Sequence, residues 1–159
     1  MKFQVHLIIH GRHLKNVKWL KALSYWREAA DYEIFEKYTS IQGHGIALVV
    51  QAIEEGATHL IACGGDGTLN ECVNGYMSKN AEIPMGVLPM GTGNDFIKMI
   101  AKKGDWKEIH ENIIHQRCKK VDLAFMEFTD LQNKIAQRSF VTVMGVGLGG
   151  EVVQNMARS

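Results

Sequence analysis

Residues 60–71 read LIACGGDGTLNE and constrain the fold more than any other part of the sequence. Four apolar residues are followed by three glycines within four positions, and these glycines enclose Asp66. Apolar residues then recur at the spacing of one helical face. These positions are Leu69, Cys72, Val73, Tyr76 and Met77. The stretch therefore predicts a buried strand, a glycine-rich turn and a helix, in that order.

A strand that enters a helix through a glycine-rich turn is a favourable place for a phosphate group. The first N–H groups of a helix have no partner within the helix, and the helix dipole adds positive potential there. Glycine allows positive φ angles and lets a ligand approach the backbone closely. A tight turn without a ligand is the alternative interpretation, but the Asp, Thr, Asn and Glu around the glycines favour a phosphate site.

The length and composition fit one ordinary globular domain, or one domain with part of a second. Of the 159 residues, 46% are hydrophobic and 22% are charged, and the formal net charge is +1. A charge this close to zero does not favour a nucleic-acid partner. The three cysteines are far apart and form no CxxC pair, which argues against a disulfide framework or a zinc site. Reduced thiols favour a cytoplasmic location.

No signal peptide or membrane-spanning segment is predicted. Residues 1–10 contain an apolar run that resembles a strand, but they lack a long hydrophobic region and a small-residue cleavage site. No apolar run approaches the roughly 18 residues that a spanning helix requires. Any membrane contact is therefore expected to be peripheral.

Apolar runs and helical patterns alternate along the chain up to about residue 116. Short strands are predicted at 3–9, 32–38, 58–63 and 85–88, with helices between them. A second glycine turn, MGTGND at 90–95, follows the fourth strand and again leads into a helix. This order predicts a parallel sheet with helices on both faces, an α/β three-layer domain. Ligands bind such sheets beyond the carboxyl ends of the strands, so both glycine turns are expected to face one crevice.

Side chains at two helix starts have the chemistry of N-caps. Asn16 precedes a helix whose apolar face includes Trp19 and Trp26, which we expect in the core. Asn94 or Asp95 is expected to cap the helix after the second glycine turn.

The pattern changes after Cys118. Residues 121–128 alternate with period two, residues 129–137 are polar and typical of a turn, and residues 140–146 are again extended. This order predicts an antiparallel hairpin. We therefore expect an α/β domain at 1–125 and the β-rich beginning of a second domain at 126–159.

Three aspartates are candidates for magnesium. Asp66 and Asp95 lie in the two glycine turns, and Asp122 lies at the start of the β-rich segment. Carboxylates near a bound phosphate usually hold Mg²⁺, because they would otherwise repel the anion. Taken singly, Asp95 as a helix cap and Asp122 as an exposed strand residue are competitive alternatives.

Other motifs carry less weight. No GxxxxGK[ST] or GxSxG sequence occurs, which excludes a P-loop and a hydrolase nucleophile elbow. Gly145, Gly147 and Gly150 fit GxGxxG, but no acidic residue can follow about 20 positions later, as a dinucleotide site requires. The histidines do not cluster, and His44, at a predicted helix start, is a weak site candidate.

The two glycine motifs together resemble the catalytic domain of the diacylglycerol kinase family. GGDGTLNE at 64–71 and VLPMGTGNDF at 87–96 carry the resemblance, in this order and about 25 residues apart. Thr39 with Gly43-His44, and Lys119-Lys120-Val121-Asp122, are similar to further segments of that family. Residues 140–153 are similar to the segment that enters its second domain. The resemblance covers nearly the whole chain.

The resemblance implies a fold, a reaction and site residues. The fold is an α/β nucleotide-binding domain followed by a β-sandwich domain, of which this chain holds only the first antiparallel strands. The reaction is transfer of the γ-phosphoryl group of ATP to a lipid hydroxyl, with Mg²⁺ held through waters by Asp66, Asp95 and Asp122. The implied nucleotide-binding residues are Gly11, Arg12, Thr39, Gly64, Gly65, Asp66, Gly67, Thr68, Leu69, Asn70, Glu71, Gly91, Thr92, Gly93 and Asn94.

The chain departs from the family pattern in two places. Family members commonly carry Asn-Pro-x-Ser-Gly after the first strand, where this chain has His10-Gly11-Arg12-His13. A shorter Asn-Gly-Lys form occurs in some bacterial members, and Gly11-Arg12 can do the same work. The family's general base belongs to the second domain, so we expect these 159 residues to be inactive alone.

Two alternatives stay open from the sequence. An NAD kinase-like enzyme shares the GGDGT turn, although the GTGND turn favours the lipid branch. A truncated, non-catalytic domain would bind nucleotide or pair with a copy of itself through the exposed β-rich end at 118–146, as a homo-oligomer.

Overall fold

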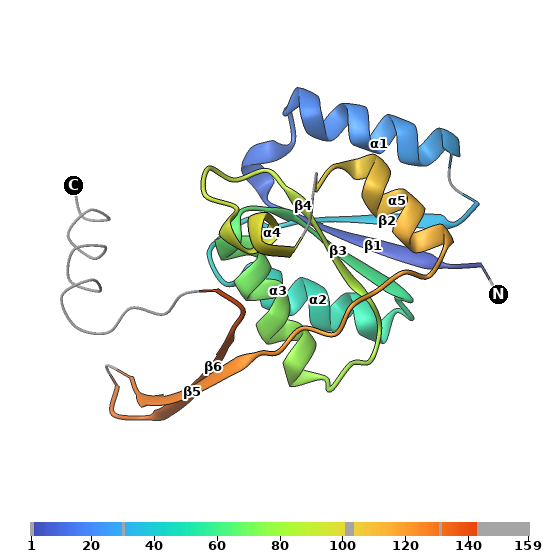
Figure 1. Cartoon of the computed structure of the whole chain (residues 1–159). Helices are drawn as coiled ribbons and strands as arrows, with labels where there is room; N and C mark the ends of the chain where they lie inside the picture. Colours follow the sequence, from blue (N-terminus) through green and yellow to red (C-terminus); the bar gives the residue numbers. More distant parts are fainter. Residues whose placement is uncertain (1, 30, 101–103, 131, 143–159) are drawn as a thin grey trace.

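The computed structural model describes residues 2–29, 31–100, 104–130 and 132–142. Within them, a four-stranded parallel sheet has the order β2-β1-β3-β4, and a separate two-stranded antiparallel sheet pairs β5 with β6 (Figure 1). The strands are β1 (Gln4–Ile9), β2 (Glu33–Tyr38), β3 (His59–Gly64), β4 (Met85–Pro89), β5 (Ala124–Thr129) and β6 (Ile135–Phe140). The helices are η1 (Gly11–His13), α1 (Val17–Ala29), α2 (His44–Glu54), α3 (Asp66–Ser78), α4 (Asp95–Ile100) and α5 (Trp106–Ile114).

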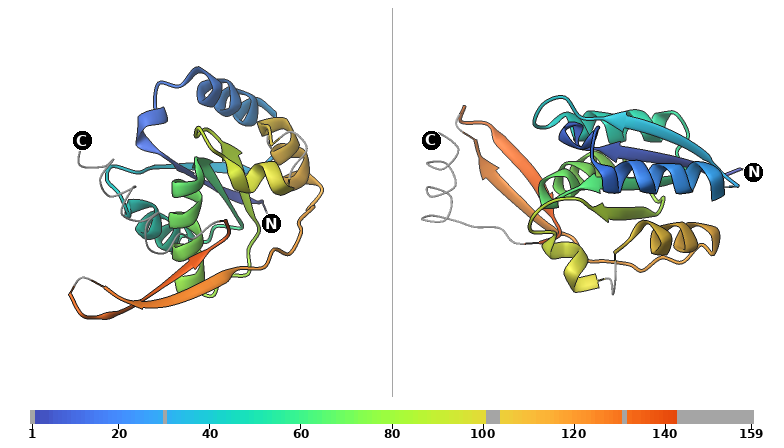
Figure 2. Two further views of the ribbon diagram at one scale, coloured as in Figure 1. Left: turned by 60° about the vertical axis from the view of Figure 1, so that its left-hand side comes forward. Right: turned by 90° about the horizontal axis from the view of Figure 1, so that it is seen from above.

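Helices cover both faces of the parallel sheet, which confirms the predicted α/β three-layer architecture. α1 and α5 lie on one face, whereas α2 and α3 lie on the other (Figures 1 and 2). Parallel sheets are stable in this arrangement because apolar side chains on both faces of each strand are buried. All six residues of β3 are buried, in agreement with its position inside the sheet.

The two helix layers form separate halves of the core. Trp19 and Trp26 of α1 are buried to 0% and 1% exposure and pack against β1, β3 and α5, as predicted. The indole N–H of Trp26 donates to the Trp106 carbonyl at 3.1 Å and so joins α1 to α5. On the other face, Leu48 of α2 and Leu69 of α3 belong to one buried cluster.

The β5–β6 hairpin extends away from the parallel sheet and is fastened to α3 (Figure 2). The side-chain amide of Asn74 donates to the Ser139 carbonyl at 3.0 Å, and its oxygen accepts the Ser139 N–H at 3.0 Å. Asn70 donates to the same carbonyl at 3.2 Å. These amides pair with β6 as a neighbouring strand would, so α3 continues the hydrogen bonding at that point of the ribbon.

The hairpin was predicted, but its second strand was placed wrongly. β6 begins at Ile135, inside the segment predicted as a turn, and the turn itself is closed by the Asp130 carboxylate, which accepts the N–H groups of Gln132 and Lys134. The strand was missed because only one of the six residues of Ile135–Phe140 is buried and the segment shows no alternation between apolar and polar residues. The predicted extended segment 140–146 and the GxGxxG glycines lie largely or wholly outside the described residues.

The predicted cap of the first helix is confirmed, and that of α4 is wrong. The Asn16 side chain accepts the N–H groups of Lys18 and Trp19 at 2.9 and 3.2 Å. The Asn94 side chain bonds Gly91 instead, and the Phe96 N–H at the start of α4 donates to Asp66 at 3.3 Å. The cap comes from the other glycine turn, a tertiary contact that local sequence does not reveal.

The predicted boundary between residues 125 and 126 falls within β5. A second domain beyond it stays a prediction. In the described part of the chain, no helix combines the length and the apolar character needed to cross a membrane.

Candidate functional site

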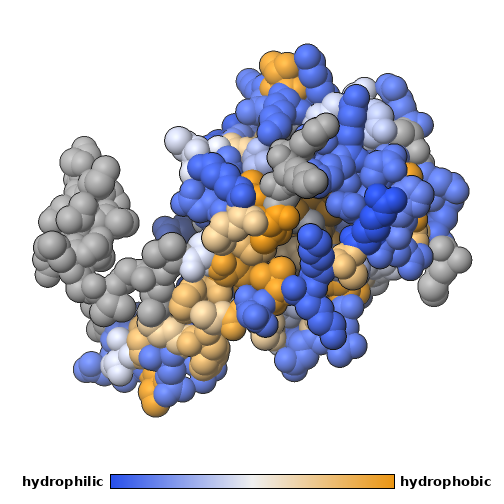
Figure 3. Space-filling view, in the orientation of Figure 1, coloured by the Kyte–Doolittle hydropathy of each residue, from blue (hydrophilic) through white to orange (hydrophobic). Residues whose placement is uncertain are grey.

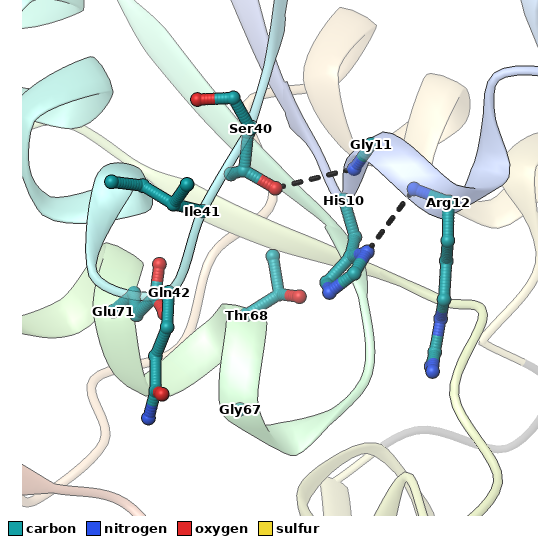
Figure 4. A pocket seen from close by; sticks show the side chains of 10 residues that line it. His10, Gly11, Arg12, Ser40, Ile41, Gln42, Gly67, Thr68 and Glu71 are labelled. Atoms are coloured by element: carbon teal, nitrogen blue, oxygen red, sulfur yellow. Dashed lines mark hydrogen bonds between the residues drawn. The ribbon is translucent and has the colours of Figure 1, made fainter.

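The candidate site lies where the chain changes direction across the sheet. From β1 the chain first forms β2 on one side and then returns to form β3 on the other. In open parallel sheets, a crevice forms at such a switch point, beyond the carboxyl ends of the strands. A cavity of about 430 Å³ lies here (Figure 4). The residues that line it are His10, Gly11, Arg12, Thr39, Ser40, Ile41, Gln42, Gly67, Thr68 and Glu71.

α3 begins directly at the first glycine-rich turn, residues 64–67. Gly65 is its N-cap and provides no side chain to satisfy the first N–H groups. A β-carbon at Gly64 would collide with the Thr68 side chain, so glycine lets this helix turn fold back onto the strand end. Gly67 and Thr68 both line the cavity. The start of α3 therefore presents N–H groups and its dipole to a ligand in this space.

The second glycine turn lies against the first. A β-carbon placed on Gly91 would come within 2.5 Å of the Gly65 α-carbon, and one on Gly65 within 3.1 Å of the Gly91 α-carbon. Asn94 closes the second turn, because its side chain accepts the Gly91 N–H at 3.0 Å and donates to the Gly91 carbonyl at 2.7 Å. The turns contact each other, but none of the described residues that line the cavity comes from residues 91–94, so a shared crevice for both turns stays a prediction.

Glu71 shapes the cavity wall. Its carboxylate accepts the Gly43 and Gly45 N–H groups, one on each oxygen, at 2.8 Å each. Gly45 must be small, because a β-carbon there would lie 2.7 Å from one of these oxygens. Glu71 thereby holds the segment between β2 and α2 against α3, two elements that lie far apart in the sequence.

The segment after β1 forms the basic end of the cavity. The Gly11 N–H donates to the Thr39 hydroxyl at 3.2 Å, and the Arg12 N–H donates to His10 Nδ1 at 3.3 Å (Figure 4). Burial, followed by the charge of Arg12 and the proximity of His10, lowers the pKa of His13. Arg12 is therefore the fixed positive charge at this end, and among the described residues no ion pair involves it.

Two of the three aspartates approach one place. A β-carbon on Gly93 would lie 3.0 Å from Asp66 Oδ2 and 3.7 Å from Asp95 Oδ2. Asp122 lies in the exposed segment before β5. No three His, Cys, Asp or Glu residues within the described part of the chain are close enough together to hold a metal ion. The carboxylates of Asp66 and Asp95 are thus the pair that the structure brings together.

Other predicted residues have structural contacts. Leu69 is 3% exposed and packs in the core beside α2. Asn70 donates to Ser139 of the hairpin. Burial raises the pKa of the Cys63 and Cys72 thiols, so both stay protonated as part of the core.

Sequence reasoning missed four cavity residues. They are His10, Ser40, Ile41 and Gln42, and the last two are exposed at the outer side of the cavity. One available signal is Ile41 itself, a large apolar residue between polar neighbours in a loop. His44 does not line the cavity, but its Nδ1 accepts the Ser40 N–H at 3.1 Å and so supports that wall.

The family described as the diacylglycerol kinase catalytic domain matches residues 4–126. The chain belongs to the diacylglycerol kinase catalytic domain family. The matched range contains the parallel sheet, both glycine turns and all the described residues that line the cavity.

Named relatives agree with this assignment. A diacylglycerol kinase of Staphylococcus aureus strain JH9 is 39% identical over 99 residues, and that of strain Newman has the same values. These matches cover 62% of this chain and 31% of each relative. The chain therefore spans about a third of the length of the curated relatives that it matches.

Solved structures share the fold. A putative diacylglycerol kinase from Bacillus anthracis strain Sterne superposes with a TM-score of 0.64 at 21% identity, over 79% of this chain and 45% of that one. Another from the same strain gives 0.61 at 23% identity, over 78% of this chain and 46% of that one. The predicted family resemblance is confirmed.

Proposed function

We propose that this chain binds Mg·ATP and is the nucleotide-binding part of a lipid kinase that phosphorylates a diacylglycerol-like hydroxyl. The observation that carries the proposal is the cavity at the switch point of the sheet, which is lined by Gly67 and Thr68 at the start of α3, directly after the glycine turn that contacts Gly91. Family membership and relatives named diacylglycerol kinase support it.

The cavity offers the groups that a polyphosphate requires. Gly67, Thr68 and Arg12 belong to its lining, and these residues carry backbone N–H groups at the start of α3, a hydroxyl and a guanidinium. Phosphoryl transfer depends chiefly on positioning and on stabilising the charge of the transferred group. Such preformed donors require little rearrangement when a nucleotide binds.

The residues present also suit magnesium. Mg²⁺ is usually held by one or two carboxylates together with waters and substrate phosphates. Asp66 and Asp95 provide such a pair near Gly93, and Asp66 Oδ2 is the carboxylate oxygen nearest to the position of a Gly93 β-carbon. When bound, the ion would neutralise phosphate charge. Participation of Asp122 through water stays a prediction.

We propose that the chain alone does not catalyse transfer. Glu71 is the only carboxylate among the described residues that line the cavity, and both its oxygens accept backbone N–H groups. It is therefore poorly placed to accept the proton of a lipid hydroxyl. The base is expected in the predicted second domain.

Calorimetry and a kinase assay test these proposals separately. Titration of Mg·ATP into the folded chain should show saturable binding, and absence of binding at millimolar nucleotide contradicts the first proposal. Incubation with ATP and diacylglycerol in mixed micelles should give no product; turnover that survives stringent purification contradicts the second. A parallel assay with NAD distinguishes the NAD kinase alternative.

The remaining predictions concern location and partners. Cys63, Cys72 and Cys118 are free thiols, which supports a cytoplasmic location with peripheral access to a lipid acceptor. Phe125 and Ile135 of the hairpin are 61% and 74% exposed, which supports pairing between copies of the chain. Light scattering that shows a strict monomer contradicts that pairing.

A further inference from the structure

The two ends of the cavity differ in chemistry. His10 and Arg12 lie at one end, Gln42 lies at the other, and Gly67 and Thr68 lie between them (Figure 4). One end thus has a cation next to the N–H groups at the start of α3. The other end has a neutral amide and an apolar side chain beside the Glu71 carboxylate, whose two oxygens both accept backbone N–H groups. A ligand that fills the cavity would match both ends if its charge were concentrated in one half.

The neutral end is held in place before any ligand arrives. Thr39 accepts the Gly11 N–H, and Gly43 donates to Glu71 at 2.8 Å, so the chain is fastened on both sides of residues 41–42. Between these points, the Ser40 N–H donates to His44 Nδ1 at 3.1 Å. Gly43 itself has a φ of 82°, a conformation that favours glycine and turns the chain into α2. Fastening of this kind lowers the entropic cost of binding.

Ile41 has no role in the core. Its side chain is 74% exposed, among the largest exposures of any large apolar residue in the described part of the chain. It nevertheless lines the cavity. An exposed aliphatic surface beside a polar cavity can cover a flat ring and remove that ring from water.

Gln42 has the hydrogen-bonding groups needed to distinguish one purine base from another. Its side-chain amide provides both a donor and an acceptor. Adenine presents an amino donor beside the N7 acceptor, which a glutamine amide pairs with at both positions, whereas guanine presents two acceptors along that edge. A glutamine at this place therefore favours adenine.

We propose that Ile41 and Gln42 hold the base of the nucleotide, that the Arg12 end holds its phosphates, and that Gln42 determines specificity for adenine. This assignment rests on the proposed nucleotide-binding function. It adds an orientation for the nucleotide and a residue that discriminates between purines.

Titration calorimetry with Mg·ATP, Mg·GTP and magnesium with inorganic triphosphate tests the assignment. The unaltered chain should bind ATP more tightly than GTP. Gln42→Ala should weaken the binding of ATP about tenfold, toward the affinity for GTP, as expected for loss of a two-point amide contact with a base. Ile41→Ser should weaken the binding of ATP and of GTP by similar factors. Both variants should keep the triphosphate affinity, because triphosphate has no base.

Two further variants provide a neutral control and a test of the Arg12 end of the cavity. Gln51→Ala removes an exposed amide that bonds Glu55 at 2.7 Å, and it should change none of the affinities. Arg12→Gln should weaken the binding of all three ligands. Circular dichroism should show unchanged folding for the variants at exposed positions 41 and 42.

Two results would overturn the inference, and they differ in what else they affect. If ATP binds but Gln42→Ala and Ile41→Ser leave ATP and GTP unchanged, the base lies elsewhere and the proposed function stands. If the folded, unaltered chain binds neither ATP nor triphosphate, the proposed function fails and this inference fails with it.

Discussion

Gly65 and Gly91 contact each other backbone to backbone, so closely that a β-carbon on Gly91 would lie 2.5 Å from the Gly65 α-carbon. This contact joins the ends of β3 and β4, which are also linked by the Met90 N–H donating to the Gly64 carbonyl at 2.8 Å. The two glycine motifs of the sequence are therefore one structural unit.

Gly91→Ala should destabilise the protein by about 3 kcal/mol, because the clash is with backbone that cannot move aside as a side chain can. Gly67→Ala is the matched control, since a β-carbon there meets nothing within 4 Å. Alanine inside a helix is favoured over glycine by about 0.5–1 kcal/mol, so this variant should be at least as stable as the unaltered chain. Urea unfolding measures both, and equal loss in the two variants contradicts the account.

Glu71→Gln should loosen the wall between β2 and α2. The amide keeps only one acceptor oxygen and directs an N–H group at a backbone donor. The free energy of unfolding should therefore decrease by about 2 kcal/mol. Amide exchange at Gly43 and Gly45 should accelerate. Glu54→Gln is the comparison: it removes an exposed contact of 2.6 Å with Lys79, which should contribute less than about 1 kcal/mol. Unchanged exchange at Gly43 in Glu71→Gln would show that the carboxylate does not hold this segment.

Asn74→Ala should release the hairpin from α3. The Ser139 N–H loses its side-chain partner and the Ser139 carbonyl keeps only that of Asn70, at a cost of about 1–2 kcal/mol. The measurable result is faster hydrogen exchange at the Ser139 amide, with α3 itself still protected. Gln137→Ala removes the exposed contact of 3.0 Å with Glu127 within the ribbon and should leave Ser139 protected. Similar exchange in the two variants contradicts a specific role for Asn74.

His6 should make the protein less stable in mild acid. Its ring is 1% exposed, and both ring nitrogens are buried without a hydrogen-bond partner in the described structure. Burial lowers its pKa below the ordinary value of 6.5; Lys37 lowers it further, and Glu55 partly offsets both. The unfolded chain then binds more protons between the lowered pKa and about 6.5, so stability is full above that range and falls as pH decreases through it.

His6→Leu tests this dependence. Each such histidine contributes at most about 1.4 kcal/mol per pH unit, and the variant should lose less stability than the unaltered chain between pH 7.5 and 5.5. Burial also lowers the pKa of His59 and His110, so part of the acid sensitivity should remain. His115→Gln, at an exposed position, is the control. An unchanged pH dependence in His6→Leu contradicts the assignment.

The regular elements of the α/β domain were predictable because their signals are local. Apolar spacing marked the strands and helices, and Asn16 marked the start of α1. Buried strands and amphipathic helices of this kind leave a periodic pattern whatever the rest of the chain does. β6 left no such pattern, because its partners are β5 and the amide of Asn74 rather than a buried face.

The site was predictable only in part. The glycine motifs indicated a phosphate-binding turn, and Thr39, Gly67 and Thr68 do line one cavity. Several contacts that shape the cavity join residues 26 or more positions apart, as in the bonds of Glu71 to Gly43 and Gly45 and of Gly11 to Thr39. No local pattern specifies such pairs. The role of Asp66 at the start of α4 is another contact of this kind.

An amide-resolved NMR titration of the folded chain with Mg·ATP tests the central claim most directly, because it locates the ligand. The largest shifts should occur at Gly11, Gly67 and Thr68 and at the base-binding residues Ile41 and Gln42, with further shifts at Gly91 through its contact with Gly65. A spectrum unchanged at millimolar Mg·ATP, or one whose changes lie away from the residues that line the cavity and from the two glycine turns, would contradict nucleotide binding at this site.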